Sequence, residues 1–230
     1  FDFVRLGGSI TGPITENLAA RVDGIYVRRD GFYNDPTNNT DINDRNRYFV
    51  RGQLLFEPTD TLSIRLIADY TYRDEKCCAA TYVDGSVNPF IGNLNNPSTP
   101  LSPLSQGGNN IINVLRDLGQ NLGAFNQGYD RTVSVTPGRS YAGETKDYGF
   151  SGQIDWDLGG ATLTSITAYR ELKNFVDQDV DFTSADIVSE VRDQQVETFT
   201  QEVRVASDFD GPFNFLLGGF YFDESIAQVS

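Results

Sequence analysis

The sequence alternates apolar and polar residues with a period of two over several long segments. The clearest is 62–73, where nearly every second side chain is apolar or aromatic. A strand places successive side chains on opposite faces of a sheet, whereas a helix would scatter both sets around its axis. The segment therefore predicts a strand with two distinct faces. One carries Leu62, Ile64, Leu66, Ala68, Tyr70 and Tyr72, and the other carries Ser63, Arg65, Ile67, Asp69, Thr71 and Arg73.

The same period recurs along the rest of the chain. Regular alternation covers 18–27, 48–57 and 148–158, and a less regular form covers 4–11, 161–175, 195–207 and 213–223. Together with 62–73, these segments predict an all-β fold of about eight strands. Membrane-spanning helices are excluded, because no run approaches the ~20 consecutive apolar residues that such a helix needs.

The connections between these segments alternate strictly between short and long. Short turns are expected at 12–17, 58–61, 159–160 and 209–212, and long connections at 32–44, 74–142 and 176–193. An antiparallel barrel in an outer membrane has short periplasmic turns and longer external loops. The sequence therefore predicts an antiparallel transmembrane β-barrel segment with this arrangement of turns and loops.

Aromatic residues gather at both ends of the predicted strands, as two girdles at the membrane surfaces would require. Next to the long loops lie Tyr26, Tyr48, Tyr70, Tyr72, Tyr148, Tyr169 and Tyr221, and next to the short turns lie the aromatic residues Phe56, Trp156, Phe209 and Phe213 together with the apolar Leu158. If the apolar faces meet lipid, the opposite faces line the barrel interior. The lumen-facing residues expected on this basis are Arg21, Asp23, Arg51, Arg65, Asp69 and Asp155.

Composition excludes several functions. The chain has 18 basic and 32 acidic residues, a net charge of −14 and no histidine. Such a chain would repel a phosphate backbone, so no nucleic-acid partner is expected. Without histidine, Ser-His-Asp catalysis and His-based zinc sites are excluded. A carboxylate pair for glycoside cleavage would still be possible, but no pair stands out, and we expect no enzyme, no catalytic residue and no cofactor.

Several motifs resemble those of TonB-dependent receptors. Phe199–Ser207, followed by Phe213–Leu217 and Gly218–Glu224, looks like a recurrent barrel hairpin of that family. Leu163–Arg170 resembles the strand before it, and Cys77–Ala80 is similar to a loop feature of sphingomonad-type members. The resemblance covers nearly the whole chain except the interior of the longest loop.

The resemblance implies a bacterial outer-membrane protein with a 22-stranded barrel and an N-terminal plug. We expect 1–230 to be a single partial barrel without the plug, with 74–142 as a long extracellular loop inserted in it. The chain begins without a turn and Ile226–Ser230 is expected to trail past the last strand, which suggests a piece of something longer. The implied partners are outer-membrane lipid, the plug, TonB through the missing N-terminal part, and a nutrient such as a ferric siderophore, a corrinoid or a glycan.

The predicted loops hold the candidate ligand-binding residues. A short amphipathic helix is expected around 111–122, where leucine and isoleucine recur at helical spacing. Cys77 and Cys78 are adjacent and could form a vicinal disulfide that stiffens the loop base. Asp177, Asp179 and Asp181 could bind calcium, but they lack an EF-hand pattern, and no metal site is expected. Aromatic and basic candidates for ligand contact are Phe32, Tyr33, Tyr82, Tyr129 and Arg131.

Two other architectures share the period-two pattern. A complete eight-stranded outer-membrane barrel with a structural or adhesive role would knit the polar faces into a narrow salt-bridged core. A soluble β-sandwich that binds glycans would bury the apolar faces between two sheets. The alternation of short and long connections favours a barrel over the sandwich. The expected trailing end of the chain at 226–230 favours a receptor segment over the complete small barrel.

Overall fold

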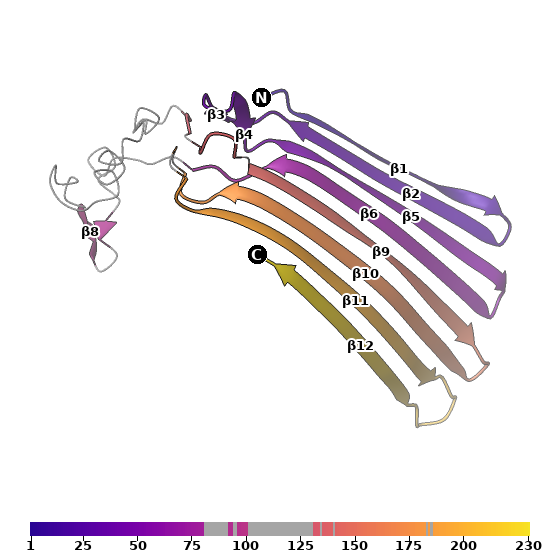
Figure 1. Ribbon diagram of the computed structural model, residues 1–230. Helices are drawn as coiled ribbons and strands as arrows, with labels where there is room; N and C mark the ends of the chain where they lie inside the picture. Colours follow the sequence, from indigo (N-terminus) through magenta and orange to yellow (C-terminus); the bar gives the residue numbers. More distant parts are fainter. Residues whose placement is uncertain are drawn as a thin grey trace.

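The computed structural model describes residues 1–80, 92–93, 96–100, 131–133, 135–139, 141–182, 184 and 186–230. It contains one large sheet of eight strands in the order β1-β2-β5-β6-β9-β10-β11-β12 (Figure 1). Each strand pairs antiparallel with its neighbour in this order. The bounds are β1 (Val4–Thr15), β2 (Leu18–Arg29), β5 (Arg45–Thr59), β6 (Leu62–Lys76), β9 (Tyr141–Asp157), β10 (Ala161–Asp179), β11 (Ser189–Ser207) and β12 (Leu216–Val229).

Two short hairpins lie in the long connections. One pairs β3 (Tyr33–Asp35) with β4 (Thr40–Ile42), and the other pairs β7 (Gly92–Asn93) with β8 (Asn96–Pro100). The described residues include no helix long and apolar enough to span a membrane. The helix predicted around 111–122 lies outside the described residues.

The structure confirms the eight predicted strands and the alternation of short and long connections, but several strands are longer than predicted. The loop predicted at 74–142 is shorter, because β6 continues to Lys76 and β9 begins at Tyr141. The third connection also shortens, since β10 reaches Asp179 and β11 begins at Ser189. These extensions carry mixed polar residues. They lack the periodic apolar face that marked the rest of each strand, and polar contacts such as the 2.9 Å hydrogen bond from Gln178 to Glu190 accompany their backbone pairing.

The last strand differs from its predicted bounds at both ends. It begins at Leu216 rather than Phe213, because the preceding turn is closed by side chains: Asn214 Oδ1 accepts a hydrogen bond of 2.7 Å from the backbone N of Phe209. The prediction that 226–230 trails past this strand was wrong. Pairing with β11 continues to Val229, which lies opposite Asp193.

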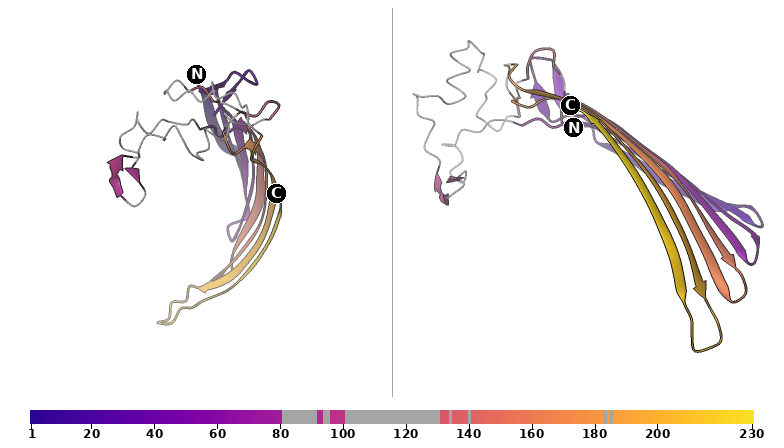
Figure 2. Two further views of the ribbon diagram at one scale, coloured as in Figure 1. Left: turned by 60° about the vertical axis from the view of Figure 1, so that its left-hand side comes forward. Right: turned by 60° about the horizontal axis from the view of Figure 1, so that its bottom comes forward.

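The large sheet bends into an open arc (Figure 2). β1 and β12 form its two edges, and no hydrogen-bond ladder joins them, although both strands lie wholly within the described residues. The described strands also include no second large sheet packed against the first. The open sheet therefore differs from a closed eight-stranded barrel and from a sandwich, and has the architecture of a β-barrel segment.

The apolar face of the sheet is the more exposed one, which inverts the pattern of a soluble protein. On the polar face of β5, Phe49, Arg51 and Gln53 are half-buried. The apolar-face residues of the same strand are exposed, and they are Tyr48, Val50, Leu54 and Phe56. On β6 and β9, Leu66 is 50% exposed and Phe150 58%. A continuous exposed apolar surface of this extent marks a face that meets lipid or another protein.

The tyrosines near the long loops follow a diagonal across the sheet. Some of these aromatic residues lie directly opposite one another on neighbouring strands, as Tyr26 and Tyr48 do. From β5 to β6, from β9 to β10 and from β11 to β12, the aromatic residue on the second strand lies two residues closer to the short turns than the residue opposite the first. Ring centroids along this line lie 5.9 Å apart for Tyr48–Tyr70 and 6.5 Å apart for Tyr70–Tyr148. The aromatic row comprises Tyr26, Tyr48, Tyr70, Tyr148, Tyr169, Phe199 and Tyr221.

The slope of this aromatic row matches the tilt of barrel strands. From β2 to β12 it descends by an average of one residue per strand. With a rise of about 3.3 Å per residue and a strand spacing of about 4.8 Å, this slope corresponds to a tilt of about 35°. Strands of outer-membrane barrels tilt by about 35–45°. The row would therefore lie level with a membrane surface when the strands carry an ordinary barrel tilt.

The distance between the two groups of aromatic residues fits a membrane. On β9, Tyr148 belongs to the aromatic row and Trp156 lies near the short turn, eight residues further along the strand. This separation is about 26 Å along the strand, or about 22 Å along the membrane normal at the inferred tilt. The apolar band of an outer-membrane barrel is about 25 Å tall.

In lipid vesicles, arginine substitutions at two adjacent positions of β6 should change the free energy of unfolding by very different amounts. Leu66→Arg would place a charge in the exposed apolar face and should reduce the free energy of unfolding by roughly 2–4 kcal/mol. Ile67→Arg, one residue further and on the polar face, should change it little. Equilibrium unfolding of both variants tests this, and an equal or reversed cost would show that the exposed apolar face does not meet lipid.

Candidate ligand-binding site

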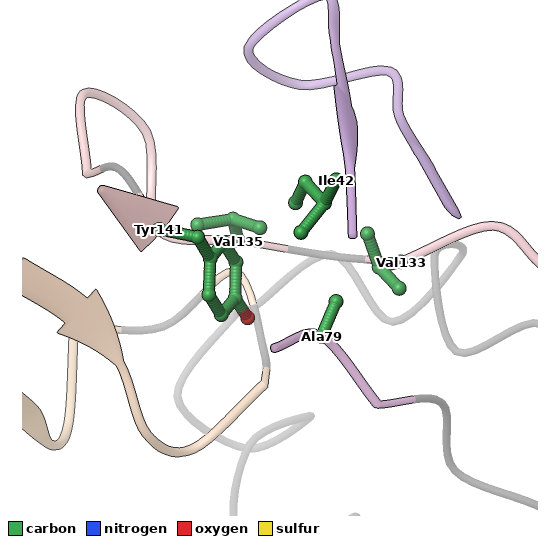
Figure 3. Packing of buried hydrophobic residues seen from close by; sticks show 5 residues of the cluster. All are labelled: Ile42, Ala79, Val133, Val135 and Tyr141. Carbon is green, nitrogen blue, oxygen red and sulfur yellow. The ribbon is translucent and has the colours of Figure 1, made fainter. Parts of the chain in front are cut away.

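A small hydrophobic core lies among the loops at the end of the sheet away from the short turns. Its buried hydrophobic members come from four separate stretches of chain and face one another (Figure 3). Tyr33 and Phe182 pack against it, and the ring of Phe182 stacks on that of Tyr141 at a centroid distance of 6.3 Å. The core members are Ile42, Ala79, Val133, Val135 and Tyr141. They are the only buried hydrophobic residues among those that the structure describes.

Two buried carboxylates hold the loops around this core. Asp35 accepts hydrogen bonds from the backbone N of Thr37 at 3.0 Å and of Asn38 at 3.3 Å. Asp179 accepts from the backbone N of Thr136 at 2.9 Å and of Phe182 at 3.2 Å. Each carboxylate thus satisfies donors that an irregular segment would otherwise leave without partners, and so fixes the loop path.

Burial changes the acidity of the second carboxylate. Asp179 is 1% exposed and lies well beyond the aromatic row, at the loop end of β10. Removal from water disfavours its charged form and raises the pKa of the Asp179 carboxyl above its ordinary value of 3.8, while the bond from Thr136 opposes that shift.

Two of the three aspartates considered as calcium ligands bind backbone donors instead. Asp179 binds backbone donors as described, and Asp181 accepts from the backbone N of Val188 at 2.9 Å. Among the described residues, no cluster of three or more acidic, cysteine or histidine side chains is arranged to hold a metal ion.

Three of the five predicted ligand-contact residues lie close together. Phe32 and Tyr33 are neighbours with ring centroids 5.1 Å apart, and the guanidinium of Arg131 lies 5.6 Å from the centre of the Phe32 ring. Tyr33 turns toward the loop core, which leaves Phe32 and Arg131 as the pair outside it. The other two candidates, Tyr82 and Tyr129, lie outside the described residues.

Sequence reasoning missed Arg29, which belongs to the same group. Its guanidinium lies 5.1 Å from the centre of the Phe32 ring, and its Nη2 donates a 2.6 Å hydrogen bond to the backbone O of Asn43. The available signal was its position at the end of a predicted strand, three residues before an aromatic residue. We name Arg29, Phe32 and Arg131 the arginine–phenylalanine cluster.

The six residues predicted to line the interior share one face of the sheet. Asp23, Arg51 and Asp69 lie in one row of the register across β2, β5 and β6, so their charges alternate in sign. Arg21 forms an ion pair with Asp23 at 2.7 Å. On the same face, Arg65 lies beside β9, where Asp155 accepts a hydrogen bond of 2.7 Å from Thr164.

A glycine allows this row of charges to cross β9. Gly149 lies between Asp69 and Arg170, and Arg170 reaches over it to pair with Asp69 at 2.9 Å and with Asp147. A Cβ atom on Gly149 would come within 3.1 Å of the Arg170 Nη2 atom and 3.0 Å of the backbone O of Tyr169. A side chain at this position would therefore displace the bridge.

Cys77 and Cys78 form a vicinal disulfide directly after β6. The backbone N of Cys77 donates to the backbone O of Tyr141 at 3.0 Å, and the backbone N of Ala79 donates to Asn43 Oδ1 at 2.9 Å. The pair thus lies at a point where three loop segments meet. Its stiffening effect on the loop base stays a prediction.

Solved structures share this fold across nearly the whole chain. The ferric yersiniabactin uptake receptor FyuA from Yersinia pestis aligns with a TM-score of 0.63 at 15% identity, covering 99% of this chain and 29% of the receptor. The siderophore receptor PiuA from Acinetobacter baumannii aligns at 0.62 and 16% identity, covering 98% and 29%. The ferric-catecholate import receptor Fiu from Escherichia coli K12 aligns at 0.64 and 11% identity, covering 97% and 30%.

The similarity is confined to the fold and to part of each receptor. No protein-family model and no curated protein sequence matches the chain. The chain spans about 30% of the length of the solved receptors that it resembles. At these low identities the similarity establishes the fold alone, which is that of a segment of a β-barrel wall.

The raised pKa of Asp179 predicts a pH dependence of loop order. In the unfolded loop the carboxyl has its ordinary pKa of 3.8, and in the ordered loop it has a higher one. Its contribution to loop order is therefore fully present below pH 3.8 and is lost as the pH rises through the raised value.

Hydrogen exchange would measure this effect. After correction for intrinsic rates, amides of 135–139 should be better protected near pH 4 than near pH 7. Asp179→Asn should reduce that difference, whereas Asp60→Asn, at an exposed position in the short turn between β5 and β6, should leave it unchanged. The same difference in all three proteins would contradict the assignment.

Proposed function

We propose that this chain forms part of the barrel wall of a TonB-dependent receptor in a bacterial outer membrane, and that the receptor takes up a siderophore-class nutrient. The observation that carries the proposal is the exposed apolar face, bounded by two groups of aromatic residues at the spacing and slope of a tilted barrel wall. The fold similarity to three siderophore receptors supports a nutrient receptor over other kinds of outer-membrane barrel.

The polar face supports a wide barrel interior. Side chains crowd on the inner side of a bent sheet, and the polar-face residues of β5 are the more buried set. Their charges are mostly arranged in pairs within the sheet, such as Arg21–Asp23 and Asp69–Arg170. These side chains would line an aqueous or plugged lumen. In the proposed receptor, the plug of the same polypeptide occupies this space and connects to TonB.

The ordered loops support a role in capturing a ligand outside the cell. A loop cluster with its own hydrophobic core and buried carboxylates holds exposed groups in fixed positions, and fixed positions reduce the entropy lost on binding. In the proposed orientation the short turns face the periplasm and this cluster faces outward. The protein is a transport receptor in this proposal, and the chain carries no catalytic step.

Uptake assays test the proposal. Source cells lacking the full-length protein should lose energised uptake of one ferric chelate under iron limitation, and re-expression should restore it. A protonophore should stop uptake while leaving binding at the cell surface. Loss of corrinoid or glycan uptake would keep the receptor assignment but replace the nutrient class, and unchanged transport of all three classes would refute it.

A further inference from the structure

Two arginines from distant parts of the sequence meet on one aromatic ring at the loop end of the sheet. Arg29 ends β2, and Arg131 lies in the connection before β9. Their guanidinium carbons lie 5.1 Å and 5.6 Å from the centre of the Phe32 ring. Arg131 also lies 5.6 Å from the centre of the Phe1 ring, which meets Phe32 edge to face at 6.2 Å.

This convergence is unusual in a chain with a net charge of −14. Many of the other basic side chains have acidic partners, such as Arg47 with Glu75 at 2.6 Å and Arg139 with Asp186 at 3.4 Å. Within the part of the chain that the structure describes, no carboxylate oxygen lies within 4.0 Å of either guanidinium of the arginine–phenylalanine cluster.

Cation–π contacts alone give the cluster little stabilisation. Each is worth roughly 0.5–1 kcal/mol at an exposed site, whereas two guanidiniums held around one ring repel each other. An anion between them would offset that repulsion. Guanidinium groups bind carboxylates and similar planar anions through pairs of parallel hydrogen bonds, so an oxygen-rich anion fits the donors.

The backbone holds the cluster in place without a ligand. Asn34 exchanges two hydrogen bonds of 2.9 Å with the segment that carries Arg131, donating to the backbone O of Arg131 and accepting from the N of Val133. The N of Phe32 donates to the backbone O of Ile42 at 3.0 Å. Gly31 allows the close approach behind this contact, because a Cβ atom there would lie 2.6 Å from the N of Ile42.

We propose that Arg29, Phe32 and Arg131 form a binding site for a small anionic metal chelate on the outer surface of the receptor. Carboxylate or catecholate oxygens of the chelate accept hydrogen bonds from the two guanidiniums, and the Phe32 ring contacts both of them. This inference rests on the proposed uptake function and narrows it, because a neutral glycan or a neutral chelate gains no charge complementarity at this site.

Binding to the purified full-length protein in detergent tests the site. The probes are ferric citrate and a ferric tris-catecholate as anionic chelates, with a neutral ferric trihydroxamate for comparison. Arg131→Gln should weaken binding of an anionic chelate by roughly tenfold or more, since hydrogen bonds between charged groups are lost. It should also reduce the salt dependence of binding, because one charge of the pair is removed.

Arg139→Gln is the matched control, since it removes the same charge from the same loop but from an arginine that already pairs with Asp186. It should leave chelate affinity unchanged, and Phe32→Leu should have an effect between the two. Each variant must keep the wild-type shift in gel mobility on boiling, which reports a folded barrel.

Three results would overturn the site: no binding of either anionic chelate, equal loss in Arg131→Gln and Arg139→Gln, or tighter binding of the neutral chelate. These results are distinguishable from failure of the proposed function. A receptor that still imports a neutral nutrient in an energised manner would keep its function and lose this site.

Discussion

The absence of water from the bilayer interior is the constraint on which the whole structure depends. Every backbone N–H and C=O at that depth needs a partner within the protein. In the proposed barrel the eight-stranded ladder supplies these partners between β1 and β12, and the outer edges of these two strands would pair with further strands of the wall. Because the ladder, not a hydrophobic interior, holds the strands together, side chains on either face are free to follow the surroundings. One face can be apolar toward lipid while the other is charged.

The same constraint explains where the hydrophobic core lies. The hydrophobic effect acts only where water is present, so it can organise the chain only outside the membrane. The described residues accordingly place their buried hydrophobic side chains among the loops, around Val135 and Tyr141. Buried Asp35 and Asp179 fix the loop backbone there through local hydrogen bonds. The loop cluster then carries the arginine–phenylalanine cluster, in which Arg29 and Phe32 are half-buried and Arg131 is exposed.

The sequence predicted the alternating strands well, because alternation along a segment such as 62–73 indicates a strand with two distinct faces. It did not predict the polar extensions of β9, β10 and β11, since strands outside the membrane need no apolar face. The loop core also escaped prediction, because Ile42, Val133 and Tyr141 come from segments without any period. For the ligand site, aromatic and basic composition indicated Phe32 and Arg131, but only the folded chain brings Arg29 to the same ring.

The most direct test of this account is a labelling scan of β6 in lipid vesicles. Single spin labels would be placed in turn at each position from 62 to 72, with Cys77 and Cys78 replaced by serine. The account predicts a period of two. Even positions, including Leu66, should be accessible to oxygen dissolved in lipid, and odd positions, including Ile67, to a water-soluble relaxation agent. A scan without alternation, or with the two sets exchanged, would contradict the assignment of the apolar face to lipid.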